Sequence, residues 1–250
     1  MDRLAGEVVI VTGAGSGIGR ATAAAFSRRG CHVALVGRRQ EPLDELARQL
    51  EQSEGEVLVA PADVTDRDAV EALVRRVAAA WGRIDVLVNN AGMNIRQRKV
   101  EEVSEQDWDS VLRVNLTGTF FMTQAVLPHM RRQRSGTVLN VSSMAGHRAF
   151  ALSGPAYGAA KAGVISFTDS LNLTERAHGV RACAVCPGEV ATPILDQRPQ
   201  PPSAEARAAM LQPEDLAETL VHVAALPQRA TIELLTIYPT VQRDWSAEAT

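Results

Sequence analysis

The chain of 250 residues carries a net charge of −3, and 46% of its residues are hydrophobic and 22% charged. This composition is ordinary for a soluble globular protein, and the length suffices for one domain with a sizeable core, which we expect to span residues 1–250. The weak negative charge, with no long run of Lys and Arg, argues against nucleic acid as a partner.

The N-terminal region and the cysteines favour a cytoplasmic protein. No basic segment followed by an apolar stretch precedes the first strand pattern, and no apolar run approaches the ~20 residues that span a bilayer. Cys183 and Cys186 form a CAVC motif, but residues three apart in a buried strand point to opposite faces, and no second Cys or His pair follows. We therefore expect no membrane association, no metal site and reduced thiols.

Short apolar runs alternate with amphipathic segments along the chain. Runs rich in Val, Ile and Leu predict strands at 7–11, 32–36, 56–60, 84–88, 137–141, 180–185 and 231–237. Helical patterns lie at 17–29, 42–53, 66–81, 104–132, 155–178 and 214–226. Because strands without polar alternation are buried on both faces, we predict an α/β fold with a doubly wound, seven-stranded parallel sheet and helices on both faces.

One stretch before the last predicted helix has an unusual composition. LDQRPQPPSAEARAAM (195–210) contains Pro199, Pro201 and Pro202, and Pro193 lies just before it. The stretch is too short for a domain and too long for a tight turn. We therefore expect residues near 190–212 to form a substrate loop over a site.

A glycine-rich turn joins the first predicted strand to the first helix. VIVTGAGSGIGRA fits the pattern Thr12-Gly13-x-x-x-Gly17-x-Gly19 rather than the common dinucleotide pattern G-x-G-x-x-G. Glycines let the backbone turn tightly and approach a pyrophosphate, whose charge is stabilised at a helix N-terminus. The turn therefore indicates a nucleotide site.

The stretch AYGAAKAG (156–163) combines two rare residue types. Among 26 Lys and Arg residues only Lys99 and Lys161 are lysines, and Tyr157 and Tyr238 are the two tyrosines. On a helix, the i,i+4 spacing places Tyr157 and Lys161 on one face, where they form either an ordinary exposed pair or a chemical one. The other motifs decide between these interpretations.

In chain order, the motifs resemble those of the classical short-chain dehydrogenase/reductase family, which has a Rossmann-type fold. TGAGSGIG matches the family's cofactor loop, NNAG (89–92) follows the fourth strand, SSMAG (142–146) the fifth and CPG (186–188) the sixth, with YxxxK between the last two. The resemblance spans essentially the whole chain. It implies an NAD(P)-dependent oxidoreductase that acts on CH–OH donors, and a homotetramer, or a homodimer, built partly on helices 104–132 and 155–178.

The resemblance assigns catalytic roles to four residues. Tyr157 would be the general acid/base, Lys161 would lower its pKa and hold the nicotinamide ribose, Ser143 would hydrogen-bond the substrate oxygen, and Asn115 would support a water-linked proton relay. A phenol can donate the proton that a reduced carbonyl needs if its pKa falls from ~10 toward neutrality, and a nearby ammonium favours the phenolate.

Two of these assignments have plainer alternatives. Ser143, chosen over Ser142 by the S-x-x-G pattern to Gly146, could be a turn former, and Asn115 could only bend a helix. The gap from Ser143 to Tyr157 is one residue longer than the family's commonest spacing. We interpret the excess as a one-residue extension in the loop RAFALSG, which affects the shape of the pocket more than the catalytic role.

The resemblance also implies the residues that hold the cofactor. They are Gly13, Gly15, Ser16, Gly17, Ile18, Gly19, Gly37, Arg38, Arg39, Asp63, Val64, Asn90, Ala91, Gly92, Tyr157, Lys161, Pro187, Gly188, Val190 and Thr192. Among these, Asp63 resembles the residue that accepts a hydrogen bond from the adenine amine.

The end of the second strand favours NADP(H) over NAD(H). Gly37 occupies the position of the acidic residue that usually holds a ribose 2′-hydroxyl, and Arg38 can pair with a 2′-phosphate. Two observations oppose this preference. Ser16 takes a place where some NADP-preferring relatives carry a basic residue, and Arg38 and Arg39 could merely begin a solvated helix.

The sequence indicates the substrate-binding residues less clearly than the cofactor-binding residues. The substrate-binding candidates are Ser143, Met144, His147, Tyr157, Glu189 and Leu195, and Met93, Asn94, Ala149 and Phe150 also flank the motifs. A loop histidine is more often solvated or structural, and Glu189 either receives a cationic or polyhydroxylated substrate or has only a surface or helix-start role.

We expect hydride transfer to or from a small-molecule ketone or secondary alcohol, as in a carbonyl reductase or a hydroxy-acid or alcohol dehydrogenase. The alternatives are a 3-oxoacyl reductase, an NAD-dependent dehydrogenase, or a non-catalytic dinucleotide-binding sensor or scaffold. The C-terminal stretch TIELLTIYPTVQR lacks the glycine pair that typically ends the ketoacyl reductases of the family, which argues against fatty-acid synthesis.

Overall fold

The computed structural model describes residues 3–242 and 244, and its strands form one parallel sheet. The strands are β1 (Val8–Thr12), β2 (His32–Gly37), β3 (Val57–Pro61), β4 (Val86–Asn89), β5 (Gly136–Val141), β6 (Val180–Pro187) and β7 (Leu234–Ile237). Their spatial order is β3-β2-β1-β4-β5-β6-β7, and neighbouring strands pair in parallel. The order reverses between β1 and β4, which is where open parallel sheets bind ligands.

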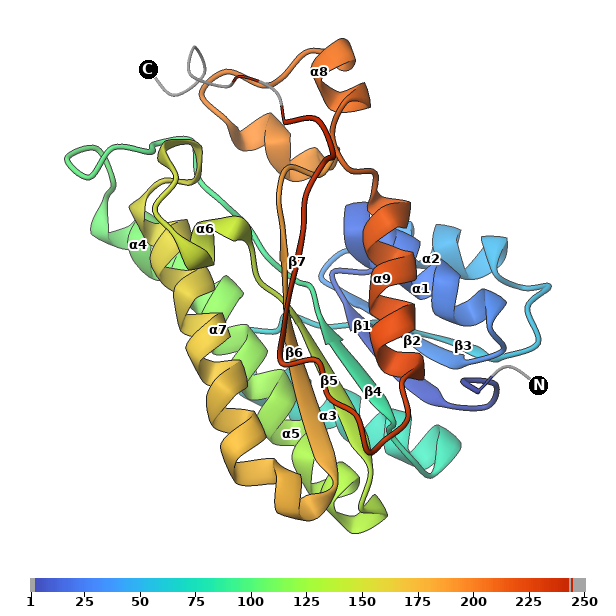
Figure 1. Cartoon of the computed structure of the whole chain (residues 1–250). Helices are drawn as coiled ribbons and strands as arrows, with labels where there is room; N and C mark the ends of the chain where they lie inside the picture. The colour runs from blue at the N-terminus through green and yellow to red at the C-terminus, as the bar shows by residue number, and fades with distance from the viewer. Residues whose placement is uncertain (1–2, 243, 245–250) are drawn as a thin grey trace.

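Helices cover both faces of this sheet. They are α1 (Gly17–Arg28), α2 (Gln40–Gln49), α3 (Arg67–Trp81), α4 (Glu105–Leu112), α5 (Gly118–Gln133), α6 (Met144–His147), α7 (Pro155–Glu175), α8 (Ala204–Ala208) and α9 (Pro213–Ala225), with the short elements η1 (Arg113–Thr117), η2 (Ala151–Ser153), η3 (Arg176–His178) and η4 (Pro193–Gln197). Helices α1, α2 and α9 pack on one face, and α3, α5 and α7 on the other (Figure 1). The predicted doubly wound α/β fold is confirmed.

The central strands divide their side chains between the two layers. Val9 and Val11 of β1 pack into the cluster under α1, α2 and α9, whereas Val8 and Ile10 pack into the cluster under α3, α5 and α7. All residues of β1 are buried, which explains why its sequence shows no polar alternation. A sheet buried on both faces is a rigid support for the loops at its carboxyl edge.

Capping residues determine where several helices begin and end. Asp66 caps α3 by accepting hydrogen bonds from two backbone N–H groups of the first turn, and Gly82 ends the helix in the left-handed conformation (φ 73°). Pro213 occupies the first turn of α9, where its fixed φ and missing N–H are tolerated. These signals are local, so the sequence located both helices to within a residue or so.

The predicted helix 104–132 is interrupted. A π-helical segment, η1, separates α4 from α5, and Asn115 lies in its centre. The amide nitrogen of Asn115 donates to the carbonyls of Val111 (2.8 Å) and Met93 (2.9 Å), so a polar side chain competes for the helix's own acceptors. Such competition widens a helical turn, and π segments are frequent at functional sites.

Two other predictions differ in detail. The loop predicted at 195–210 contains part of η4 and the short helix α8, and α6 was not predicted at all. The last strand begins at Leu234 rather than at residue 231, and it lies at the edge of the sheet with β6 as its neighbour.

Among the described helices, none combines the length and the apolar character that crossing a bilayer requires.

Candidate active site

Two adjoining pockets open at the carboxyl ends of the strands. The first is lined by the glycine turn, by the loops that follow β4, β5 and β6, and by the start of α7, whereas the second lies beside the ends of β2 and β3. Gly13, Ser16 and Gly92 line both pockets. The two pockets therefore meet at the point where the strand order reverses.

The predicted cofactor residues fall into these pockets with one exception. The first pocket is lined by Gly17, Ile18, Asn90, Tyr157, Lys161, Pro187, Gly188, Val190 and Thr192. The second is lined by Gly15, Gly37, Arg38, Arg39, Asp63, Val64 and Ala91. Gly19 lines neither pocket. A Cβ on Gly19 would lie 2.3 Å from the carbonyl oxygen of Gly13, so this glycine is needed for the turn to pack against α1.

Thr12 ties the glycine turn to the loop after β4. Its hydroxyl donates to the carbonyl of Val88 (3.2 Å) and accepts from the backbone N–H groups of Asn90 (2.9 Å) and Ala91 (3.0 Å). The side-chain amide of Asn90 donates back to the Thr12 carbonyl (3.0 Å), and a Cβ on Gly13 would lie 2.8 Å from that amide nitrogen. The TG and NNAG motifs therefore form one packed unit.

The N-terminus of α1 points its free N–H groups toward the pockets. Ser16 is the N-cap residue, its side chain makes no capping hydrogen bond, and the first turn contains no acidic residue. The first N–H groups of a helix lack intrahelical partners and carry a partial positive charge. The residues present thus fit a dinucleotide, because its pyrophosphate would satisfy these donors.

The second pocket is positively charged at the end of β2. Arg38 and Arg39 are exposed, and neither forms an ion pair with the described residues. Asp63 is the one acidic residue among the described residues that line this pocket. One oxygen of Asp63 accepts from the backbone N–H (2.9 Å) and the hydroxyl (2.8 Å) of Thr65, which fixes the orientation of that carboxylate.

Ser143, Tyr157 and Lys161 line the first pocket together. Tyr157 and Lys161 lie one turn apart on α7, and the Nζ of Lys161 is 5.5 Å from the centre of the Tyr157 ring. Lys161 is buried and its Nζ donates to the carbonyl of Val141 (2.7 Å), at the end of β5. Ser143 caps α6 and accepts from the N–H of Ala145 (3.1 Å). Neither residue of the YxxxK pair is an ordinary surface residue.

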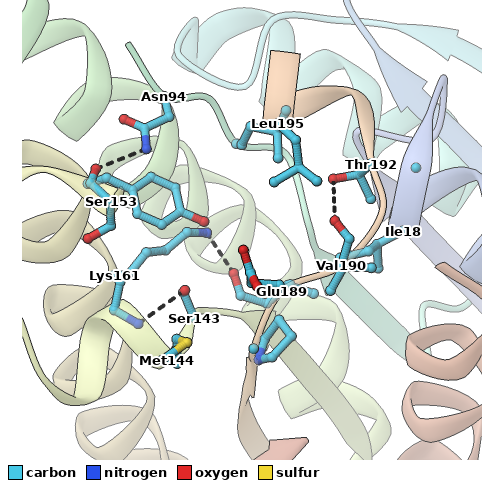
Figure 2. Close-up of a pocket in the computed structure, with 18 of the residues that line it drawn as sticks. Ile18, Asn94, Ser143, Met144, Ser153, Lys161, Glu189, Val190, Thr192 and Leu195 are labelled. Carbon is cyan, nitrogen blue, oxygen red and sulfur yellow. Dashed lines mark hydrogen bonds between the residues drawn. The ribbon is translucent and has the colours of Figure 1, made fainter. Parts of the chain in front are cut away.

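The S-x-x-G pattern has a physical reason in the contact between α6 and α7. A Cβ on Gly146 would lie 2.7 Å from the carbonyl oxygen of Lys161 and 2.9 Å from the hydroxyl of Ser142. That hydroxyl donates to the same Lys161 carbonyl (2.8 Å). Both serines line the pocket, but the hydroxyl of Ser142 is used in this structural link to α7. Figure 2 shows Ser143 at the pocket.

Burial dominates the acid–base properties of the pair. It raises the pKa of Tyr157 to about 12, against hydrogen bonding by Ser143 and the positive charge of Arg98, which lower it. It also lowers the pKa of Lys161 to about 8. We expected the Lys161 ammonium to bring the phenol toward neutrality. In the structure, desolvation outweighs the favourable effects, and the cation that lowers the tyrosine pKa is Arg98.

Asn115 lies behind Gly92 rather than in either pocket. Besides its donated bonds, its side-chain oxygen accepts from the backbone N–H of Met93 (3.3 Å). A Cβ on Gly92 would lie 2.8 Å from that oxygen and 3.7 Å from the Nζ of Lys161. Asn115 thus bends the helix and also approaches the lysine, so the two interpretations of this residue are compatible.

The substrate end of the first pocket contains most of the predicted candidates. Met144, Glu189 and Leu195 line it, as do Asn94 and Phe150. Asn94 donates to the carbonyl of Ser153 (3.0 Å), and Figure 2 shows this pair on the opposite side of the pocket from Thr192 and Val190.

His147 does not line the pocket, because it is the exposed last residue of α6. Glu189 is not free to receive a cation, since its carboxylate forms an ion pair with Arg198 at 2.9 Å, and both side chains are largely buried.

Sequence reasoning missed two arginines that line the same pocket, Arg98 and Arg198. Arg98 belongs to the basic stretch RQRK after NNAG, and Arg198 to the proline-rich loop, where arginines are usually solvated. No local pattern distinguishes them from surface residues. Their position depends on loops that lie far apart in the chain.

The described residues contain no group of three or more His, Cys, Asp and Glu side chains that could hold a metal ion. Cys183 and Cys186 are buried in β6, and burial raises the pKa of both thiols. The CAVC motif is therefore part of the sheet interior.

Comparison with known proteins agrees with this geometry. The family model of the short chain dehydrogenases matches residues 7–202. The 3-oxoacyl-[acyl-carrier-protein] reductase FabG of Thermotoga maritima is 38% identical over 233 residues, which cover 89% of this chain and 92% of that protein.

Solved structures are similar over nearly the whole length. An alcohol dehydrogenase from the archaeon Thermococcus sibiricus, complexed with 5-hydroxy-NADP, superposes with a TM-score of 0.85 at 29% identity, over 95% of this chain and 98% of that one. The closed form of a serine dehydrogenase complexed with NADP⁺ gives 0.86 at 33% identity, over 95% and 96%. The family match and these similarities, together with the fold and the pockets, show that the chain belongs to the short-chain dehydrogenase/reductase family of NAD(P)-dependent oxidoreductases.

Proposed function

We propose that the chain is an NADP(H)-dependent oxidoreductase that transfers a hydride between nicotinamide and a small-molecule ketone or secondary alcohol. The observation that carries this proposal is the presence of Ser143, Tyr157 and Lys161 with the glycine turn around one pocket. Residues 1–250 act in it as one dinucleotide-binding domain, and the loop near 190–212 contributes Leu195 to the substrate end.

Side chains of the chain donate and accept the proton. Bound NADPH supplies the hydride. Tyr157 donates its phenolic proton to the carbonyl oxygen during reduction and removes the alcohol proton during oxidation, while Ser143 donates a hydrogen bond to the same oxygen. Lys161 holds ribose hydroxyls and returns a proton to the phenol, and Asn115 supports a water relay behind it. Burial raises the pKa of Tyr157, so at neutral pH the phenol carries the proton that reduction of a carbonyl requires.

The cofactor preference rests on the charge of the second pocket. Arg38 and Arg39 bind the 2′-phosphate of NADP(H), and Asp63 accepts from the adenine amine. Among the described residues, Arg38 and Arg39 have no ion-pair partner, and Gly37 stands in place of the acid that would hold a 2′-hydroxyl. Two structural relatives were solved with NADP or its derivative.

The ratio of kcat/KM with NADPH to that with NADH tests this preference. We expect a ratio above ten, and we expect Arg38→Ala to lower it by about tenfold, the value of one lost charge-assisted hydrogen bond. Arg48→Ala, an exposed arginine of α2 outside both pockets, is the matched control and should leave the ratio unchanged. A wild-type ratio of one or below contradicts the proposal.

Hydride transfer itself is tested with a panel of ketones and alcohols, monitored by the absorbance of the reduced nicotinamide. We expect turnover of several small ketones. If NADPH binds tightly but no substrate of the panel reacts, the chain is a dinucleotide-binding sensor or scaffold instead.

A 3-oxoacyl reductase is a second candidate, favoured by the 38% identity to FabG. Against it, the chain has Tyr238 and Pro239 where the glycine pair is expected, and a Cβ on Gly188 would lie 2.9 Å from the Tyr238 ring, so the tyrosine packs beside the cofactor loop. Including acetoacetyl-coenzyme A in the panel distinguishes the two candidates. A thioester strongly preferred over free ketones identifies a 3-oxoacyl reductase.

We further propose a cytoplasmic homotetramer, with α5 and α7 at its interfaces. Phe120 of α5 and Leu173 of α7 are exposed apolar residues, with 37% and 78% of their surface accessible, and Trp108 of α4 is also exposed. Such residues are expected to be covered in an assembly. Light scattering coupled to gel filtration measures the mass, and a monomer at micromolar concentration contradicts the proposal.

A further inference from the structure

Arg98 brings a positive charge into the substrate end of the first pocket. It lines that pocket with Tyr157, and its charge lowers the tyrosine pKa. Burial and the neighbouring charge of Arg198 lower the pKa of Arg98 to about 10, so the guanidinium remains charged at neutral pH. Removing a cation partly from water costs free energy unless hydrogen bonds or an opposite charge compensate the lost hydration.

Backbone groups hold Arg98 in place without neutralising it. Its Nη1 donates to the carbonyls of Leu152 (2.8 Å) and Ser153 (3.1 Å), and its Nη2 donates to the carbonyl of Gln197 (3.0 Å). A Cβ on Gly154 would lie 3.1 Å from its Cδ, so the glycine before α7 makes room for the side chain. These bonds join the loop before Tyr157 to the substrate loop, and they leave the charge intact.

No carboxylate of the described chain pairs with Arg98. Its Nε is buried and has no hydrogen-bond partner, although a guanidinium has five N–H donors to satisfy. Glu189 is the one acidic residue among the described residues that line the pocket, and it forms an ion pair with Arg198. Lys161, the remaining cation of the pocket, is assigned to the cofactor.

The charges that line the substrate end therefore do not cancel. Among the described residues that line it, Arg198 forms an ion pair with Glu189, and Arg98 has no carboxylate partner. A guanidinium forms charge-assisted hydrogen bonds with carboxylates, and one N–H of the Arg98 Nη2 remains after the three bonds to carbonyls. A neutral ketone would leave this charge uncompensated, whereas an acid would satisfy it.

We propose that Arg98 binds an anionic group, a carboxylate, of the substrate, so that the enzyme acts on oxo acids and hydroxy acids in preference to neutral ketones. This inference rests on the proposed oxidoreductase function and names the substrate class for the same site. The length of the spacer between carboxylate and carbonyl is left to the experiment.

The test compares each oxo acid with its uncharged methyl ester. kcat/KM is measured with NADPH for 2-oxo, 3-oxo and 4-oxo acids of four or five carbons and for their methyl esters. We expect one acid to exceed its ester by about 10–100-fold, the range of a hydrogen bond to a charged group. Esters equal to or better than the acids at every spacer length overturn the inference.

Arg98→Met should lower the acid-to-ester ratio at least tenfold. Loss of a merely structural link between the loops would slow acids and esters alike, so an unchanged ratio in this variant also overturns the inference. Arg96→Met is the matched control, because Arg96 is exposed on the same loop and lines neither pocket. Arg98→Lys keeps the charge and should retain an acid preference, which provides a second variant if Arg98→Met does not fold.

Equilibrium binding separates the two proposals. The complex of wild-type enzyme with NADP⁺ is titrated calorimetrically with butyrate and with butyramide, and we expect butyrate to bind at least tenfold more tightly. If neutral ketones are reduced but butyramide binds as well as butyrate, the function stands and the role of Arg98 is wrong. If butyrate binds preferentially but no ketone or oxo acid is reduced, hydride transfer is wrong and the anion site stands.

Discussion

The amino and carboxyl edges of the sheet both contain buried charged side chains, but these side chains differ in how many bonding partners they have. At the amino edge Arg181 and Asp85 each have several hydrogen-bonding partners. At the carboxyl edge Lys161 has one backbone acceptor, and Arg98 has no carboxylate among the described residues. The comparison teaches that a fully paired buried charge belongs to the fold, whereas an uncompensated one is available for a ligand.

Arg181 and Asp85 illustrate the amino edge. Arg181 of β6 donates to the hydroxyl of Thr137 (3.0 Å) and to five backbone carbonyls of the segment 223–230, at the end of α9 and after it. Asp85 accepts two hydrogen bonds from Arg83, each of 2.7 Å, and one from the backbone N–H of Val8 (2.9 Å). These groups hold strand ends and a helix end together.

The largest effect should come from the carboxyl edge. Tyr157→Phe removes the proton donor and should lower kcat by about 10²–10⁴-fold, the usual contribution of a positioned acid or base, with no loss of the fold. Steady-state kinetics with any substrate of the panel, together with circular dichroism, measures both. Tyr238→Phe is the control, because Tyr238 lines a neighbouring pocket and not the one that contains Tyr157, and loss of its hydroxyl should leave kcat within a few-fold of wild type. Near-normal turnover by Tyr157→Phe would falsify the catalytic assignment.

At the amino edge the effect should appear in stability instead. Arg181→Met leaves the carbonyls after α9 without donors and should lower the free energy of unfolding by about 3 kcal/mol, as when a buried polar network is broken. Urea denaturation measures this change, and kcat at low temperature should be retained.

Arg176→Met provides the matched control, because Arg176 pairs with Glu233 at the surface, where a pair contributes at most about 1 kcal/mol. Equal losses in the two variants would contradict the distinction between paired buried charges and surface charges.

The pH dependence of cofactor binding should follow the titration of Lys161 at the carboxyl edge. Burial lowers the pKa of Lys161 from its ordinary 10.5 to about 8, so the ammonium loses its proton as the pH rises through that value. Since kcat/KM for the cofactor reports groups of the free enzyme, it should fall about tenfold between pH 7 and pH 9. A profile flat to pH 10 would show that the lysine keeps an ordinary pKa.

The smallest effect concerns Glu7, beside Asp85 at the amino edge. Burial and the charge of Asp85 raise the pKa of Glu7 to about 7, above its ordinary 4.5, despite the opposing charges of nearby arginines. A raised pKa means that the folded state favours the protonated form. The stability contributed by that proton is fully present below pH 4.5 and is lost as the pH rises through 7.

Glu7→Gln should therefore stabilise the protein at pH 8 by about 1 kcal/mol after allowance for solvent screening, and the gain should shrink toward pH 5. Thermal unfolding at the two pH values measures the difference. A variant that is less stable than wild type at pH 8 would indicate that Glu7 is ionised and usefully paired.

Features that depend on neighbours in sequence were determined by the sequence itself. The apolar runs located the seven strands, and the helical patterns at 66–81 and 214–226 located α3 and α9. The i,i+4 spacing placed Tyr157 and Lys161 on one face of α7. The sequence also indicated the glycine turn, because the positive φ of Gly13 (68°) is a local requirement that favours glycine. Short-range physics acts over a few residues, and a single sequence displays it directly.

Tertiary structure alone decided which charges are paired and which titrate unusually. Arg98 meets the carbonyls of Leu152 and Ser153 across more than fifty residues of chain, and Glu189 meets Arg198 through the fold of the substrate loop. The pKa of Tyr157 depends on how much water the surrounding loops remove, so the spacing to Lys161 could not predict its direction. Desolvation and long-range pairing are properties of the packed molecule, and no local pattern encodes them.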